Sequence, residues 1–117
     1  MASGAMKSVS RMLIARDELP DRQIVAVNAD IDGESESILL YRDDDQIQGW
    51  LNICPHAGRR LDYAPGRFLI QDGDLVCAAH GATFRLDNGE CVAGPCRGAS
   101  LKAVPLRFVE GQVCLAD

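Results

Sequence analysis

The sequence lacks any long hydrophobic run. No apolar stretch approaches the roughly 20 residues that a helix needs to cross a bilayer, and the N-terminus has no apolar segment typical of a secretory leader. These absences predict a cytoplasmic protein with no membrane partner. Residues 1–7 read as a disordered start or a tag remnant, and we expect a single domain over residues 8–117.

Aromatic residues and basic charge are also scarce. Only 5% of the residues are aromatic, so the core is expected to be mostly aliphatic. The chain has 12 Lys and Arg against 17 Asp and Glu, which gives a net charge of -5. This balance argues against nucleic acid as a partner, because phosphate binding needs a positively charged face. It favours docking to a basic patch on another protein.

Signals for long helices, internal repeats and low-complexity tracts are missing as well. Short apolar runs alternate with turn residues every ~8–12 positions, a spacing that predicts an all-β domain of antiparallel strands. Hairpin turns are indicated where Gly follows Asp, Asn or Glu, at 31–35, 72–73, 88–89 and 110–111. The expected strands are 12–15, 24–30, 36–42, 46–53, 67–71, 74–77, 82–86, 90–93, 102–109 and 112–116.

Histidine is scarce too, and both histidines follow a cysteine closely. The stretches are CPHAGRRL at residues 54–61 and CAAHGATF at residues 77–84, each predicted to be a glycine-containing loop after a strand. Two thiolates and two imidazoles can bind zinc or an iron–sulfur cluster. A zinc finger usually pairs Cys with Cys and His with His, whereas here each loop supplies one of each. That arrangement suits a two-iron cluster in which one iron takes both thiolates and the other takes both imidazoles.

The two loops resemble the Rieske [2Fe–2S] motif, with one Cys-x-His loop and one Cys-x-x-His loop. The resemblance runs from about residue 12 to the end and includes the later Gly-Pro and the closing hairpin. It implies an antiparallel β-sandwich of the Rieske type, with a small cluster-binding subdomain inserted at about residues 52–94. It also implies one [2Fe–2S] cluster per chain, held by Cys54, His56, Cys77 and His80.

Residues next to the ligands bear on the redox potential. High-potential members of the family carry a disulfide cysteine at the positions of Arg59 and Ala79, and Ser and Tyr at the positions of Ala82 and Phe84. The hydroxyls donate hydrogen bonds to sulfur and stabilise the reduced state. Because this chain has neither device, we expect a potential in the lower part of the Rieske range of about -150 to +300 mV, as in Rieske-type ferredoxins.

Three further residues are expected beside the cluster. Gly58 and Gly81 suit the tight turns of loops whose backbone approaches sulfur closely. Pro95 belongs to a segment that resembles the proline loop that shields the cluster from water. Arg59 and Arg60 follow His56 closely, and three roles stay open for them: to steer an acidic partner, to raise the potential through their positive charge, or to remain solvated loop residues.

Three cysteines remain outside the motif: Cys91, Cys96 and Cys114. An odd total of five fits free thiols or metal ligands better than a disulfide framework. Cys91 and Cys114 are expected to be buried thiols on strands. A disulfide between Cys91 and Cys96 is the less favoured alternative.

The resemblance implies a non-catalytic electron carrier that transfers one electron from a reductase to an oxygenase or another acceptor. Two other interpretations stay open. The chain could be the small subunit of a larger oxidoreductase, similar to nitrite reductase small subunits, or a zinc-stabilised interaction domain.

Overall fold

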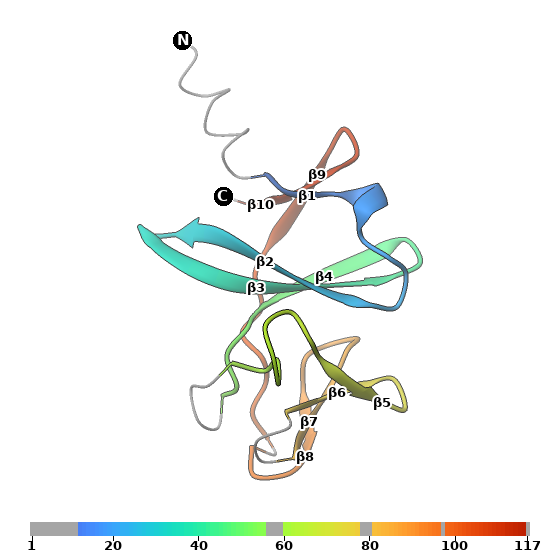
Figure 1. Ribbon diagram of the computed structural model, residues 1–117, viewed down its shortest axis with the longest axis vertical. Coiled ribbons are helices and arrows are strands. Elements are labelled where there is room, and N and C mark those ends of the chain that lie inside the picture. The colour runs from blue at the N-terminus through green and yellow to red at the C-terminus, as the bar shows by residue number, and fades with distance from the viewer. Residues whose placement is uncertain (1–11, 56–59, 78–80, 97, 117) are drawn as a thin grey trace. The chain divides into compact units, whose positions relative to one another are not determined.

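The computed structural model describes residues 12–55, 60–77, 81–96 and 98–116. Its regular structure is β-strand apart from one short 3₁₀ turn, which confirms the predicted all-β class (Figure 1). Within the described residues, no helix has the length and apolar character of a membrane span. The elements are β1 (Met12–Ala15), η1 (Arg16–Glu18), β2 (Ile24–Ile31), β3 (Glu34–Asp43), β4 (Gln46–Leu51), β5 (Leu69–Gln71), β6 (Asp74–Cys77), β7 (Ala82–Arg85), β8 (Cys91–Ala93), β9 (Leu106–Val109) and β10 (Gln112–Leu115).

The chain forms two compact units. The terminal unit comprises Met1–Gly49 and Val104–Asp117, and the central unit comprises Trp50–Ala103. The boundary therefore falls inside β4 and again just before Pro105. The subdomain expected at residues 52–94 lies within the central unit, and its role in holding a cluster stays a prediction.

The terminal unit contains two three-stranded sheets, with strand orders β2-β3-β4 and β1-β10-β9. β2 and β3 pair without interruption from Ile24 opposite Tyr41 to Ile31 opposite Glu34. Their two-residue turn, Asp32-Gly33, has positive φ at both positions (52° and 86°). This is the turn geometry that an Asp-Gly pair favours in hairpins, so the sequence signal is confirmed.

β3 supplies the centre of the terminal core. Ile38, Leu39 and Leu40 are all 0% exposed. Since successive strand residues point to opposite faces, both faces of β3 are covered here. On the neighbouring strand, a Cβ at Gly49 would lie 3.3 Å from a methyl of Leu106 and 3.4 Å from a methyl of Leu40. The glycine thus leaves room for a β9 side chain to pack on β4, which joins the two sheets of this unit.

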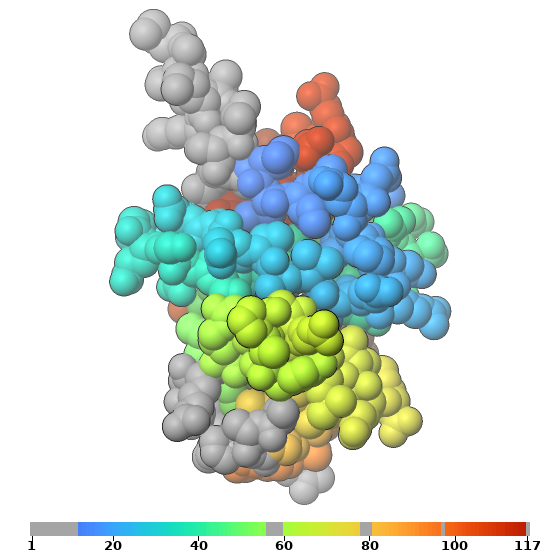
Figure 2. Space-filling view, in the orientation of Figure 1, coloured from blue at the N-terminus to red at the C-terminus, as the bar shows by residue number. Residues whose placement is uncertain are grey.

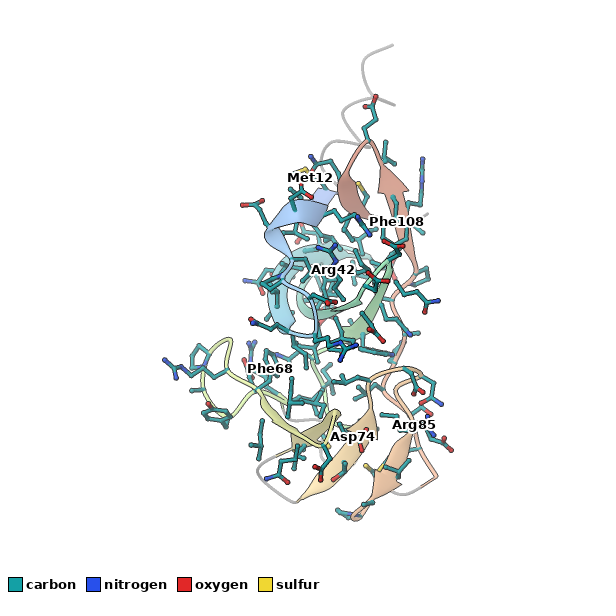
Figure 3. The ribbon with its side chains drawn as sticks, turned by 90° about the vertical axis from the view of Figure 1, so that its right-hand side faces the viewer. Met12, Arg42, Phe68, Asp74, Arg85 and Phe108 are labelled. Carbon is teal, nitrogen blue, oxygen red and sulfur yellow. The ribbon has the colours of Figure 1, made fainter. Side chains whose placement is uncertain are left out.

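Arg42 anchors the polar connection that follows β1. Its Nη1 donates to the carbonyl of buried Leu19 at 3.1 Å, and its Nε donates to the carbonyl of Asp44 at 2.9 Å. The N–H of Asp44 in turn donates to the carboxylate of Asp21 at 2.7 Å. Figure 3 shows Arg42 within the terminal unit. The bonds to Leu19 and Asp21 hold residues 16–23 against the hairpin of β3 and β4, and the bond between Arg42 and Asp44 braces the hairpin turn itself.

The central unit is built on one four-stranded sheet with the order β5-β6-β7-β8. The β5–β6 hairpin turns at Asp72-Gly73, again with two positive φ angles (52° and 81°), as predicted. β6 then pairs with β7 from Asp74 opposite Arg85 to Cys77 opposite Ala82. Figure 3 labels the first of these pairs. The second pair places the start of the 78–80 loop at the end of this hairpin.

Trp50 packs in the core of the central unit, where it is 2% exposed. A Cβ at Gly89 would lie only 2.7 Å from the Trp50 Nε1 atom. Gly89 also has φ of +77°, and its carbonyl accepts from Leu101 N–H at 2.8 Å. Glycine is required at this turn both for its backbone angle and for the contact with the indole.

The start of the next-to-last expected strand was predicted too early in the sequence. The sequence predicts a strand over 102–109, whereas β9 begins at Leu106. Proline has no N–H to donate to a ladder, and the strand starts directly after Pro105. The preceding residues pair elsewhere, because the Lys102 carbonyl accepts from Leu51 N–H and Ala103 bridges Trp50.

Candidate metal centre

Asn52 closes the first ligand loop. Cys54 follows the end of β4 and is fully buried, and residues 56–59 lie outside the described part of the chain. Leu61, which follows this loop, is buried and donates its N–H to the Asn52 Oδ1 atom at 2.8 Å. Asn52 is itself 1% exposed. One buried amide therefore ties the entry of the loop to its exit.

Asp62 fixes the segment that leaves this loop. Its side chain is 2% exposed and accepts from Arg60 at both oxygens, at 3.0 Å from Nε and 2.8 Å from Nη2. The N–H of Gly66 adds a bond at 3.1 Å. Figure 2 shows this region, in yellow-green, at the surface of the central unit. A paired Arg–carboxylate fork is a geometrically specific, charge-assisted contact.

The hydrogen bonds around Asp62 favour its ionised form. Those from Arg60 lower the pKa of Asp62 below its ordinary value of 3.8, while burial opposes this shift. The N–H of Gly66, the charge of Arg60 and a hydrogen bond from Asn52 lower the pKa further. The Asp62 carboxylate therefore interacts both with Asn52, which closes the first loop, and with Arg60, which follows that loop.

The second ligand loop is held by a tight turn. Cys77 ends β6, residues 78–80 lie outside the described part, and the chain returns at Gly81. The N–H of Gly81 donates to the Cys77 carbonyl at 2.8 Å, and Gly81 has φ of +73°. This backbone angle favours glycine and closes the loop over four residues.

Cys77 lies on an apolar, buried face of the sheet. It stands opposite Ala82, and Leu75 stands opposite Phe84 on the same face. Phe84 is in turn opposite Cys91 of β8. All five side chains are buried. Ala82 and Phe84, at the two positions where a Ser and a Tyr would favour a high potential, have no hydroxyl to donate to Cys77.

The Gly94-Pro95 segment contacts the second loop directly. A Cβ at Gly94 would lie 2.8 Å from the Ala82 Cα atom and 3.0 Å from the Gly81 carbonyl oxygen. Gly94 has φ of +91°. Backbone therefore packs on backbone at Gly94, and the next residue, Pro95, is exposed.

The described residues fit the thiol half of a two-thiol, two-imidazole site. Cys54 and Cys77 are both buried and outside any disulfide, and each precedes a loop that carries one histidine in the sequence. Within the described ranges there is no group of three or more His, Cys, Asp or Glu side chains placed to hold a metal. This is expected, because His56 and His80 lie outside those ranges.

Some predicted site residues can be placed and others cannot. Ala82 stands opposite Cys77, the N–H of Gly81 donates to the Cys77 carbonyl, and Phe84 lies two residues along β7 from Ala82, opposite Leu75. Those outside the described residues are His56, Gly58, Arg59, Ala79 and His80. Sequence reasoning missed Asn52 and Asp62, which hold the first loop. The available signal was the presence of two short polar side chains flanking the first motif, one at each end.

The chain belongs to the Rieske [2Fe-2S] domain family, whose pattern matches residues 10–107. Membership of this family implies a Rieske-type [2Fe–2S] cluster, which agrees with the burial of Cys54 and Cys77 outside any disulfide. The comparison with curated proteins found no match.

Solved structures share the fold. The ferredoxin of carbazole 1,9a-dioxygenase from Nocardioides aromaticivorans IC177 is 25% identical, with a TM-score of 0.66 over 90% of this chain and 94% of that chain. A complex of reduced oxygenase and oxidized ferredoxin in carbazole 1,9a-dioxygenase contains a chain that is 21% identical, with a TM-score of 0.69 and 90% of each chain covered. A structural-genomics protein assigned as a nitrite reductase NADPH small subunit is 20% identical, with a TM-score of 0.63 over 91% and 96%.

Proposed function

We propose that this protein is a low-potential, Rieske-type electron carrier with one cluster per chain. Cys54 and Cys77 would bind one iron, and His56 and His80 would bind the other. The observation that carries the proposal is the pair of buried cysteines outside any disulfide, each at the entry of a loop with one of the two histidines, in a chain of this family. When bound, such a cluster accepts and releases one electron at a time.

The residues around the thiols would set the shape and polarity of the site. Asn52 and Asp62 hold the first loop, and Gly81 and Gly94 let the second loop close tightly. The apolar face around Cys77 excludes water and supplies no hydroxyl from Ala82 or Phe84. A sulfur without such donors is stabilised less in its reduced form, which supports a low potential.

The partners would be a reductase that supplies the electron and an oxygenase or another acceptor that takes it. One structural neighbour is a ferredoxin seen in complex with its oxygenase, and another is a dioxygenase ferredoxin. The excess of acidic residues in this chain supports docking on a basic surface. The likeness to a nitrite reductase small subunit supports a second candidate, a subunit of a larger oxidoreductase.

The cluster is tested by spectroscopy on the purified full chain. We expect visible absorption bands, iron and acid-labile sulfide in equal amounts, a Rieske-type EPR signal on reduction and a midpoint below about +100 mV. Colourless protein loaded with zinc would establish the zinc-stabilised alternative instead. A midpoint above that value would contradict the low-potential assignment.

Variants assign the ligands. Cys54→Ser and Cys77→Ser are expected to lose the visible bands, while Cys114→Ser is the matched control because Cys114 is a buried thiol of the terminal unit. Retention of the bands in either of the first two would contradict the ligand set.

To separate the two functional candidates, the protein is isolated from its native host under mild conditions. A stoichiometric large partner would identify a subunit, whereas free protein that passes electrons to an oxygenase would identify a carrier.

A further inference from the structure

The β2 strand forms a long open edge in the terminal unit. It lies at one end of the order β2-β3-β4, and β1, its neighbour in the chain, pairs with β10 instead. With 8 residues, β2 is the longest edge strand among those that the structure describes. Figure 2 shows the hairpin of β2 and β3, in blue to cyan, at the surface of this unit. A sheet edge of this kind accepts a further strand when its outer backbone groups are unpaired.

The register of the hairpin determines which backbone groups of β2 face outward. Ile31 lies opposite Glu34 across the two-residue turn, so this pair is hydrogen-bonded, and the bonds to β3 recur at every second residue. The residues in between point their N–H and C=O groups away from β3. They are Ile24, Ala26, Asn28 and Asp30. Within the described part of the chain, these outward groups have no other hydrogen-bond partner.

Three features that usually block strand addition are missing from β2. Its sequence, IVAVNADI, has neither lysine nor proline, and it pairs with β3 without a bulge. Val25, Val27 and Ala29 lie on one face of the strand and are only half-buried. By contrast, β9 has 4 residues and directly follows Pro105, and β1 contains a register shift. Of these edges, β2 is therefore the one best suited to pair with a further strand.

The distribution of charge along the hairpin favours a second copy of β2 in antiparallel orientation. Arg22 precedes the strand, and its side chain is 75% exposed, with only a long contact of 3.8 Å to the exposed Asp43. The other end of the hairpin carries four charged side chains, all of them acidic and exposed: Asp30, Asp32, Glu34 and Glu36. A two-fold axis places Arg22 of each copy beside the acidic end of the other, so opposite charges meet twice. Parallel pairing would bring like charges together instead.

We propose that two copies of this protein associate through β2, which pairs antiparallel with β2 of the second copy. One register pairs all four outward-facing residues, and it places Val27 on the two-fold axis. The resulting pairs between the copies are Ile24 with Asp30 and Ala26 with Asn28, each formed twice. Every such pair makes two hydrogen bonds, and the two sheets become one continuous sheet. This association involves the terminal unit alone and is independent of the cluster and of electron transfer.

The wild-type chain provides the first test. Sedimentation equilibrium from about 10 µM to about 1 mM should show a reversible equilibrium between monomer and dimer, in about 0.15 M salt to screen the net charge of -5. Across this range, the outward amides of β2 should exchange hydrogen about threefold or more slowly in the concentrated sample. The amide of Phe108, which faces outward on β9, should not change. A chain that stays monomeric throughout, or a dimer without slower exchange in β2, would overturn the proposal.

A proline on the edge tests the backbone pairing. Ala26→Pro removes one outward N–H and places a ring where the second copy would bind, while the bonds from β2 to β3 remain. The dimer dissociation constant should rise about tenfold or more. Phe108→Pro, at an outward-facing position of β9, is the matched control and should leave that constant unchanged. If the two variants affect association equally, β2 is not the interface.

Two further variants test the orientation and the register. Arg22→Glu should weaken the dimer, and the charge swap with Asp30→Arg should restore it, because the two side chains are diagonal neighbours across the axis. Val27→Cys should form a disulfide between copies under mild oxidation, since opposed residues of such a pair lie about 4.5 Å apart at Cα. Ser35→Cys, exposed on β3, is the control. Equal cross-linking of the two cysteine variants would contradict the register with Val27 on the axis.

Discussion

Gly94 packs directly on the backbone of Ala82, so the Gly-Pro segment and the second ligand loop are held at the contact distance of two main chains. A Cβ at position 94 would lie 2.8 Å from the Ala82 Cα atom, closer than real contacts allow. Gly94→Ala should therefore lower the free energy of unfolding by about 2–4 kcal/mol, from strain at φ of +91° and from the clash together. Urea unfolding measures this loss, and the visible absorbance per chain should fall with it.

Gly98 provides the matched control for Gly94→Ala. It has a similar φ of +95°, but a Cβ there would meet no atom within 4 Å. Gly98→Ala should cost only the backbone strain, about 1–2 kcal/mol, and should leave the absorbance unchanged. Equal effects of the two substitutions would contradict the importance of the Gly94–Ala82 contact.

The Asp62 fork predicts a pH-dependent contribution to stability. Asp62→Asn removes a buried carboxylate that accepts from Arg60 and Gly66. We expect a loss of about 1–2 kcal/mol at pH 7, in the lower range for charged hydrogen bonds because Arg60 is half exposed. Since the pKa of Asp62 is lowered in the folded state, this contribution is present above the unfolded value near pH 4 and disappears as the pH falls through the folded one. Urea unfolding measured from pH 7 to pH 2 should show that the free energies of unfolding of the wild type and Asp62→Asn become equal in acid.

Asp87→Asn tests whether burial of the carboxylate is the reason that Asp62 contributes to stability. Arg85 and Asp87 form a fork of the same kind, at 3.0 and 2.6 Å, but both side chains are at least half exposed. Solvent screens such a pair, so we expect little change in stability at any pH. If Asp62→Asn and Asp87→Asn behave alike, the assigned role of the buried carboxylate is wrong.

Substitution of Asn52 should lower stability more than substitution of an exposed asparagine. Asn52→Ala leaves the Leu61 N–H without its buried acceptor and removes a hydrogen bond to Asp62. An unsatisfied buried donor costs about 1–3 kcal/mol, and the first loop would lose its closure. Denaturant unfolding and cluster content should both fall. Asn88→Ala, which removes an exposed bond to Glu90 N–H at 2.9 Å, is the control and should reduce neither appreciably.

The sequence contains enough local information for the fold class and the hairpins. Asp32-Gly33, Asp72-Gly73 and Glu110-Gly111 all adopt two positive φ angles, because few residue pairs tolerate that turn. The first residue of β9 could not be predicted from local sequence. Residues 102 and 103 pair with Leu51 and Trp50, about 50 positions earlier in the sequence, and no local pattern encodes such a partner.

In the candidate site, too, some features can be predicted from the local sequence and others cannot. The residue types in the two loops indicate metal chemistry because thiolate and imidazole are strong ligands wherever the chain places them. The residues that hold the first loop in place could not be recognised by their type alone. Asn52 and Asp62 matter only because folding buries them within hydrogen-bonding distance of Leu61 and Arg60, and short polar residues near a loop are common in any sequence.

Phe84→Tyr tests how the apolar face sets the potential. Phe84 is 0% exposed and lies two residues along β7 from Ala82, the partner of Cys77. A hydroxyl that donates to sulfur would stabilise the reduced state, and a gain of about 1 kcal/mol corresponds to a rise of ~40 mV for a one-electron couple. Potentiometric titration should show this rise in Phe84→Tyr and no change in Phe68→Tyr, where the added hydroxyl lies on a half-buried residue before β5. A folded Phe84→Tyr protein with an unchanged midpoint and lower stability would mean that the hydroxyl is buried without an acceptor, and that Phe84 does not control the potential.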